Sequence, residues 1–190
     1  DHRVLHSFPT RRSSDLLQSV GIGITNLIFT FVGLWLIDRL GRRTLLFIGS
    51  LGYILSLGMT SWAFFTAHHA IVPVCIFAFM ASHAVGQGAV IWVLISEIFP
   101  NRHRAEGQAL GSFTHWVFAA LLTTFFPKMV DAFPPGYIFL FFCGMMVLQL
   151  LWVRLMVPET KGISLEEMQH RLGIDTGEGG RTPPPKPAGT

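Results

Sequence analysis

Five long apolar blocks, separated by short polar turns, dominate the pattern of the chain. They cover residues 17–37, 44–66, 71–98, 107–130 and 136–157. Each block holds about 21 to 28 residues, and roughly 20 residues are enough for an α-helix to cross the hydrocarbon core of a bilayer. Membrane-spanning β-strands would be about ten residues long and would alternate in polarity, which these blocks do not do. The pattern therefore predicts five transmembrane helices.

The overall composition agrees with a membrane chain. Hydrophobic residues make up 51% of the chain and charged residues 13%, whereas a soluble domain has about 25% charged residues. The formal net charge is +3, but the basic residues lie mostly at the ends of the apolar blocks and in the tails, where they set membrane orientation. Basic residues do not interleave with aromatic residues in a polar region, which argues against a nucleic-acid partner.

The regions that flank the apolar blocks differ from them in character. Residues 1–16 are polar and lack helical periodicity. We interpret them as an artefactual segment, with a natural loop before the first helix as the alternative. Residues 158–172 form a cytosolic segment in which the sequence PETKG is followed by apolar positions at near-helical spacing, Ile163, Leu165, Met168 and Leu172, which predict a short amphipathic helix on the cytosolic surface. Residues 173–190 are rich in Gly, Pro and Thr, which is typical of a disordered tail.

The distribution of basic residues indicates which helix ends face the cytosol. The turns at residues 38–43 and 100–106 are rich in arginine, and basic residues also follow the fifth block. The turns at residues 67–70 and 131–135 contain neither Lys nor Arg. Because Lys and Arg concentrate on the cytoplasmic side of membrane proteins, we expect both basic turns and the C-terminus to face the cytosol.

Acidic and basic residues converge on this predicted cytosolic face. Charge is costly near a membrane interior, and an arginine can bind a carboxylate through two parallel hydrogen bonds. One interpretation is that these charges only set the topology. We favour a gating network of ion pairs that stabilises one of two conformational states. The predicted members are Asp38, Arg39, Arg42, Arg43, Glu97, Arg104 and Glu159.

Three short motifs follow one another along the chain. They are DRLGRR at residues 38–43, WVLISEIFPNRHR at residues 92–104 and PETKG at residues 158–162. Together they resemble the motifs of the sugar porter family of the major facilitator superfamily, over about residues 17–172. The resemblance implies an all-α polytopic membrane helix bundle with the major facilitator fold, truncated to helices eight to twelve of a twelve-helix transporter. An odd number of helices also indicates truncation, because transporter folds are commonly built from paired repeats.

The resemblance also implies a sugar-binding wall. Asn26 corresponds to a family asparagine that hydrogen-bonds sugar hydroxyls, Trp92 to a tryptophan that lies against the sugar, and Trp116 to a second tryptophan. A lone asparagine in a membrane helix can instead bond a neighbouring helix. His115 stands where relatives usually carry Asn or Gln. The ring of His115 can hydrogen-bond a sugar hydroxyl or, as a structural residue, a neighbouring helix, and both alternatives stay open.

The segment before Trp92 departs from the family pattern. The family usually carries a Gly-Pro pair where Gly88 and Ala89 stand here. Gly86 and Gly88 still permit local unwinding of the helix. Gln87, beside them, is compatible with either a pore-lining or an interhelical position.

The predicted function is that of a secondary transporter in the cell membrane. It would move a monosaccharide by alternating access, with a missing N-terminal half as its partner and lipid around it. Uniport and proton symport both stay open, because the middle parts of the five blocks contain no Asp or Glu and the family's coupling carboxylate lies in the other half. The alternatives are a porter for another small polar or drug-like solute and a membrane fragment that transports nothing. The sequence offers no nucleophile–base pair or phosphate loop, so we predict no catalytic residues, metal or cofactor.

Overall fold

A computed structural model describes residues 8–99, 103–163 and 167. Every regular element that these residues form is helical. The α-helices are α1 (Phe8–Leu40), α2 (Arg42–Phe65), α3 (Val72–His83), α4 (Ala89–Ile98), α5 (Arg104–Ala132) and α6 (Pro135–Met156). A 3-10 turn, η1 (His69–Ile71), precedes α3, and a π-helical turn, η2 (Ala84–Gly88), joins α3 to α4.

Five stretches are long and apolar enough to cross a membrane, as the sequence predicted. They are Leu16–Leu40, Arg42–Phe65, His69–Ile98, Arg104–Ala132 and Pro135–Met156. The third stretch is one span built from η1, α3, η2 and α4 in succession. The prediction of an all-helical membrane bundle with five spans is therefore confirmed.

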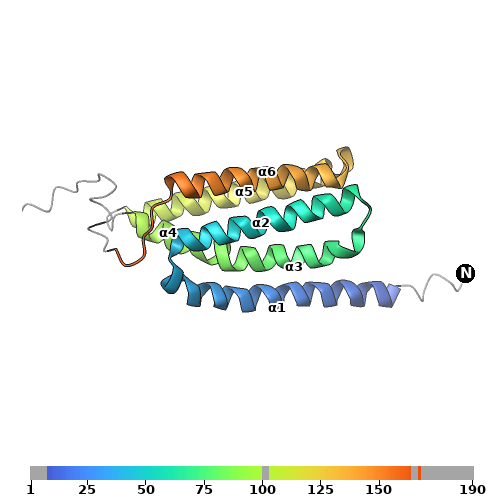
Figure 1. Cartoon of the computed structure of the whole chain (residues 1–190), viewed down its shortest axis with the longest axis horizontal. Helices are drawn as coiled ribbons and strands as arrows, with labels where there is room; N and C mark the ends of the chain where they lie inside the picture. The colour runs from blue at the N-terminus through green and yellow to red at the C-terminus, as the bar shows by residue number, and fades with distance from the viewer. Residues whose placement is uncertain (1–7, 100–102, 164–166, 168–190) are drawn as a thin grey trace, which may run out of the picture.

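The helices lie side by side with their long axes roughly aligned, and α2 occupies the middle of the bundle (Figure 1). It packs most extensively against α6 and next against α3. Half of the most apolar window of α2 is buried within the chain, whereas none of the corresponding window of α5 is. The outer helices therefore leave most of their apolar surface available to lipid or to further helices.

Two glycines allow α2 and the π turn to approach closely. A Cβ atom built on Gly86 would lie 2.8 Å from the Cα atom of Gly49, and one built on Gly49 would lie 2.9 Å from the Cα atom of Gly86. Contacts this short leave no room for a side chain at either position. Small residues serve this purpose in membrane proteins, where packing rather than hydrophobic burial holds helices together.

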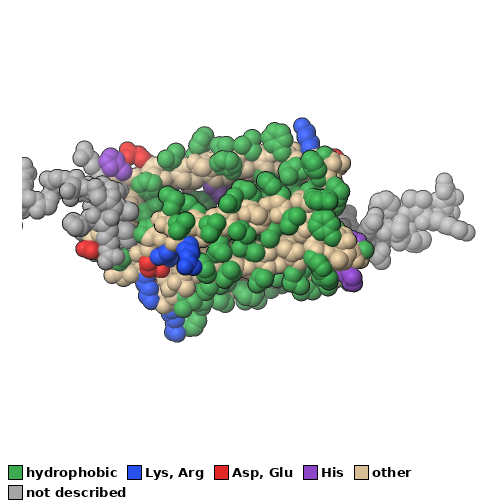
Figure 2. All heavy atoms as spheres, turned by 45° about the horizontal axis from the view of Figure 1, so that its top comes forward, with side chains coloured by type: hydrophobic (Ala, Val, Ile, Leu, Met, Phe, Trp, Pro, Cys, Tyr) green, Lys and Arg blue, Asp and Glu red, His purple; other side chains and the backbone are tan. Residues whose placement is uncertain are grey.

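Three chain segments meet at one end of the bundle. There α1 ends and α2 begins, α4 ends and α5 begins, and α6 ends (Figure 1). Lys and Arg side chains gather toward this end, while hydrophobic side chains cover the length of the bundle (Figure 2). Both arginine-bearing turns thus lie at the same end, as the sequence predicted.

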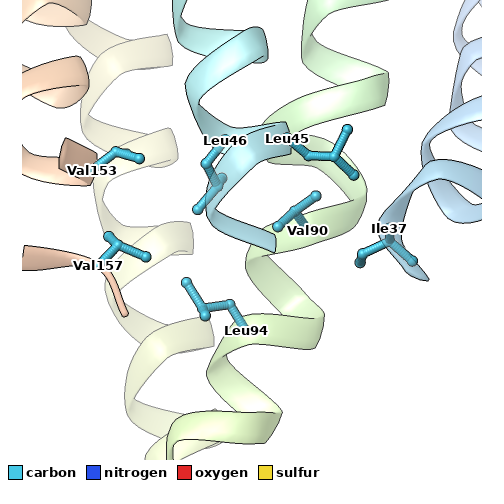
Figure 3. Close-up of a cluster of buried hydrophobic side chains, with 7 residues drawn as sticks. All are labelled: Ile37, Leu45, Leu46, Val90, Leu94, Val153 and Val157. Atoms are coloured by element: carbon cyan, nitrogen blue, oxygen red, sulfur yellow. The ribbon is translucent and has the colours of Figure 1, made fainter. Parts of the chain in front are cut away.

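Buried aliphatic side chains form a cluster just inside this end. They come from α1, α2, α4 and the end of α6, and their side chains meet between the helices (Figure 3). The cluster consists of Ile37, Leu45, Leu46, Val90, Leu94, Val153 and Val157. Leu45 follows Arg42 by about one helical turn and Leu94 precedes Glu97 by about one turn. The aliphatic cluster therefore fixes the helix ends that carry the charged residues.

The structure describes only part of the two regions that flank the five spans. The α1 helix begins at Phe8, within the polar segment that we interpreted as artefact or loop. The membrane-length stretch nevertheless begins at Leu16, after helical residues that include Arg11, Arg12 and Asp15. The PETKG residues 158–162 are not helical, and of the predicted amphipathic helix after them only Ile163 and Glu167 are described, of which Glu167 is helical. The remainder of that helix and residues 173–190 lie outside the described residues.

Candidate functional site

Arg42 is the centre of the charge cluster at the shared end of the bundle. Its Nη2 atom lies 2.8 Å from Glu97 Oε1, and its Nε atom lies 3.0 Å from Glu97 Oε2. Its Nη1 atom lies 3.2 Å from Asp38 Oδ1. The Glu97 side chain is 27% exposed and that of Asp38 is 80% exposed. The two-point contact with Glu97 therefore joins α2 to α4 in a partly buried setting, and the Asp38 pair lies in solvent.

Glu159 caps the N-terminus of α2. Its carboxylate accepts hydrogen bonds from the backbone N–H groups of Arg42 at 2.9 Å and Arg43 at 3.2 Å, and from those of residues 160–161 at 3.0 Å. A negative charge at this position also compensates the positive end of the helix dipole. Gly41 permits the approach: its φ is +93°, and a Cβ atom there would lie 2.5 Å from Glu159 Oε2. Glu159 thus acts on the backbone rather than on an arginine side chain.

The residues after Glu159 fasten this segment to two other helices. The Thr160 hydroxyl donates to Glu97 Oε2 at 2.6 Å, so Glu97 is shared between Thr160 and Arg42. The Lys161 ammonium donates to the backbone carbonyl of Arg39 at 2.6 Å. Thr160 and Lys161 were not among the predicted network residues. Their place inside the PETKG motif, directly after a predicted member, was the available signal.

Three predicted network arginines form no ion pair with the residues that the structure describes. The Arg39 guanidinium lies 4.0 Å from the centroid of the Trp35 ring. Arg43 Nη2 donates to the backbone carbonyl of Arg154. The Nε atom of Arg104 is buried without a hydrogen-bond partner among the described residues. The ion-paired centre therefore contains Asp38, Arg42 and Glu97, and the other predicted members are not part of it.

An aromatic face lies on α4 and α5. The ring of His115 lies 5.4 Å from that of Trp92 and 5.4 Å from that of Trp116, measured between centroids, with interplanar angles of 75° and 77°. Trp92 is 42% exposed and Trp116 is 67% exposed. The structure thus brings three of the four predicted sugar-contacting residues into one open aromatic group, whose indole and imidazole nitrogens can hydrogen-bond.

Asn26 lies on α1, exposed and apart from the aromatic group along the chain. Its side-chain amide forms no hydrogen bond with the described residues, which leaves its donors and acceptor available. The α1 helix packs against η2, α3, α2 and α4, and no contact between α1 and α5 occurs within the described residues. The interhelical bond that was the alternative for Asn26 is therefore not made inside the described part of the chain.

Two polar pairs connect α2 to the interrupted third span. The Tyr53 hydroxyl forms a hydrogen bond with His83 Nδ1, and Gln87 Nε2 donates to Ser50 Oγ at 3.1 Å. Gln87 is 6% exposed and Ser50 is fully buried. The structure therefore places Gln87 between helices, one of the two positions that the sequence allowed. The Tyr53–His83 pair was not predicted, because nothing in the sequence relates two residues 30 positions apart.

The local unwinding allowed by the glycines takes the form of the π turn. It runs over Ala84–Gly88, and α4 resumes at Ala89 with Trp92 one turn further on. A wider π turn leaves some backbone bonds less regular than in an α-helix, and such turns are frequent at functional sites. The turn therefore sets the direction in which α4 presents Trp92.

The five membrane-length helices, with charged residues gathered at one end of the bundle, define a polytopic membrane protein. The sequence profile of the family described as "Sugar (and other) transporter" matches residues 8–172. The chain belongs to this sugar transporter family, the sugar porters of the major facilitator superfamily. It is a family of transporters and not of enzymes, in agreement with the prediction.

Characterised relatives resemble the chain over most of its length. The glucose transporter GlcP of Staphylococcus epidermidis is 33% identical over 169 residues, which are 87% of this chain and 38% of that protein. The D-xylose-proton symporter of Escherichia coli is 35% identical over 161 residues, 81% of this chain and 33% of that protein. The inward-open structure of the E. coli xylose transporter XylE superposes with a TM-score of 0.77 at 33% identity, covering 83% of this chain and 36% of XylE. The chain thus spans between a third and two fifths of these relatives.

Proposed function

We propose that the chain forms helices eight to twelve of a sugar porter whose complete form carries a monosaccharide across the cell membrane by alternating access. The names of the relatives support this proposal, because they include a glucose transporter and a xylose-proton symporter. The observation that carries it is the exposed aromatic group of Trp92, His115 and Trp116. Aromatic faces with polar edges suit a ligand that has both C–H and hydroxyl groups.

The proposed roles follow from the chemistry of each side chain. The Trp92 ring packs against sugar C–H groups, and its indole N–H is a hydrogen-bond donor. Trp116 extends the same face. His115 bonds a hydroxyl through one ring nitrogen, and the Asn26 amide offers both donors and an acceptor. Both uniport and proton symport are compatible with these roles.

The charge cluster is proposed to stabilise one state of the transport cycle on the cytosolic side. Arg42, Glu97 and Thr160 join α2, α4 and the segment after α6 into one unit. If the cluster is intact only when the cytosolic side is closed, it favours the outward-facing state. Arg39 and Arg104 form no ion pair with described residues and are available to acidic groups of the N-terminal half. The positive-inside rule supports a cytosolic location for both basic turns and the C-terminus.

The uptake of labelled sugar by the full-length protein tests the proposed function. Cells that lack endogenous sugar uptake should accumulate labelled glucose or xylose when they express it, and unlabelled monosaccharides should compete. Trp92→Leu should lower the rate at limiting sugar by about tenfold, the effect of losing roughly 1.4 kcal/mol of contact, without changing the amount of protein in the membrane. Trp62→Leu is the matched control, because Trp62 is an indole of similar exposure that stacks on His68 at the opposite end of the bundle.

Two results would contradict the proposal. Uptake of cationic drugs without any uptake of sugars would assign the chain to a porter for another class of solute. Equal uptake kinetics for wild type and Trp92→Leu would remove the aromatic group from the sugar site.

A further inference from the structure

A groove lies between α2 and α6 at the end of the bundle that carries the charge cluster. Its volume is about 460 Å³, and its lining residues are Arg43, Thr44, Phe47, Arg154 and Leu155. The first three come from the start of α2 and the last two from the end of α6. The groove therefore combines two basic side chains with an aromatic and an aliphatic one.

The guanidinium groups of the two arginines of the groove are not paired with a carboxylate of the described residues. Neither guanidinium forms an ion pair there, and Arg43 Nη2 donates to the backbone carbonyl of Arg154, which holds the two segments together. Glu159, the nearest acid along the chain, directs its carboxylate at the backbone N–H groups of Arg42 and Arg43. Two like charges beside one groove, with no paired carboxylate, are a site for an anion.

The position of the groove relative to the membrane indicates which kind of anion it can bind. The second span begins at Arg42 and the fifth ends at Met156, so the groove lies where hydrocarbon gives way to polar headgroups. Leu155 is 78% exposed and Met156 is 71% exposed, and the face between the ends of the bundle is largely hydrophobic (Figure 2). The groove thus has a basic mouth at headgroup level and apolar surface beside it.

We propose that this groove binds the headgroup of an anionic phospholipid. Arg43 and Arg154 contact the phosphate, and an acyl chain lies along Phe47 and Leu155. A free phosphate ion would make no use of the apolar walls, whereas a phospholipid places phosphate and hydrocarbon in this order. Basic pockets between membrane helices on the cytoplasmic side suit such headgroups. The assignment does not depend on which solute the protein transports.

Native mass spectrometry of the purified chain in detergent tests this assignment. Phosphatidylglycerol and phosphatidylcholine with identical acyl chains are titrated in parallel, and the fraction of chain that retains each lipid is measured. We expect a preference for phosphatidylglycerol that falls roughly fivefold in Arg154→Gln, the effect of one basic residue at an anionic membrane surface. Arg154→Lys should keep most of the preference. The Arg154 guanidinium has no partner among the described residues, so these variants should keep the fold, which circular dichroism checks.

Lys128→Gln is the matched control, because it removes one exposed positive charge from α5 near the opposite end of the bundle. It should leave the preference unchanged. Equal retention of both lipids, or an equal effect of Lys128→Gln and Arg154→Gln, would overturn the proposal. Displacement of the lipid by an equal concentration of inorganic phosphate would overturn it in favour of a simple anion site.

Discussion

Arg42 has two acidic partners, and replacing each in turn separates a partly buried ion pair from an exposed one. Asp38 precedes Arg42 by four residues and keeps 80% of its side chain exposed, whereas Glu97 comes from α4 and keeps 27%. Glu97 also accepts the hydroxyl hydrogen bond of Thr160. Glu97→Gln therefore weakens contacts among three segments, and Asp38→Asn weakens a contact between two consecutive helices.

The expected cost of each change follows from its burial. Breaking a buried ion pair costs roughly 3–5 kcal/mol, and we expect about 2 kcal/mol for Glu97→Gln because this pair is only partly buried. The loss is substantial because the Arg42 side chain is itself only 13% exposed and would keep only the largely exposed Asp38 carboxylate as an ionic partner. An exposed i,i+4 pair contributes about 0.3–0.5 kcal/mol, which sets the expected loss for Asp38→Asn.

Unfolding of the purified chain by sodium dodecyl sulfate in mixed micelles measures both losses. Far-UV circular dichroism follows the transition, and the difference in free energy between each variant and wild type is compared. The two variants are matched, since each replaces a carboxylate by its amide and raises the net charge by one. Equal losses, or a larger loss for Asp38→Asn, would refute the reasoning that burial sets the strength of this cluster.

Two further substitutions probe the contact between α2 and the third span. Gly86→Ala places a Cβ atom 2.8 Å from the Cα atom of Gly49, so the same unfolding assay should show that the free energy of unfolding falls by about 1–3 kcal/mol. A fall below about 0.5 kcal/mol is typical of a surface substitution and would mean that the helices are further apart. Tyr53→Phe leaves His83 without its hydroxyl partner and should cost about 1 kcal/mol, and a double-mutant cycle with His83→Phe should show coupling between the two sites. Additive effects would show that the two rings do not bond.

The spans were predictable because their lengths are set by the thickness of the bilayer. The expected block at residues 44–66 and the observed α2 differ by no more than two residues at either end. The interruption of the third span was signalled only by Gly86 and Gly88, which permit a π turn but do not require one. The form of this interruption depends on the hydrogen bonds and close glycine contacts that α2 makes with it. These are tertiary contacts between residues far apart in the sequence, so the sequence pattern does not reveal them.

The charge cluster was predictable in part, for a similar reason. Opposite charges at one membrane face predicted a network that includes Arg42, Asp38 and Glu97 without saying which residues pair, and the structure joins these three in ion pairs. The use of Glu159 as a backbone cap was not predictable, because it depends on the turn that Gly41 makes. The burial of the Arg104 Nε atom without a partner among the described residues likewise depends on how α5 docks and not on its motif.

The account depends on both arginine-bearing turns and the end of α6 facing the cytosol together. Labelling of single cysteines with a membrane-impermeant maleimide in intact cells tests this directly, with Cys75 and Cys143 replaced by alanine. Leu40→Cys and His103→Cys should react only after the membrane is permeabilised, and Ala70→Cys should react in intact cells. Reaction of the Leu40 and His103 positions from opposite sides of the membrane would contradict the account.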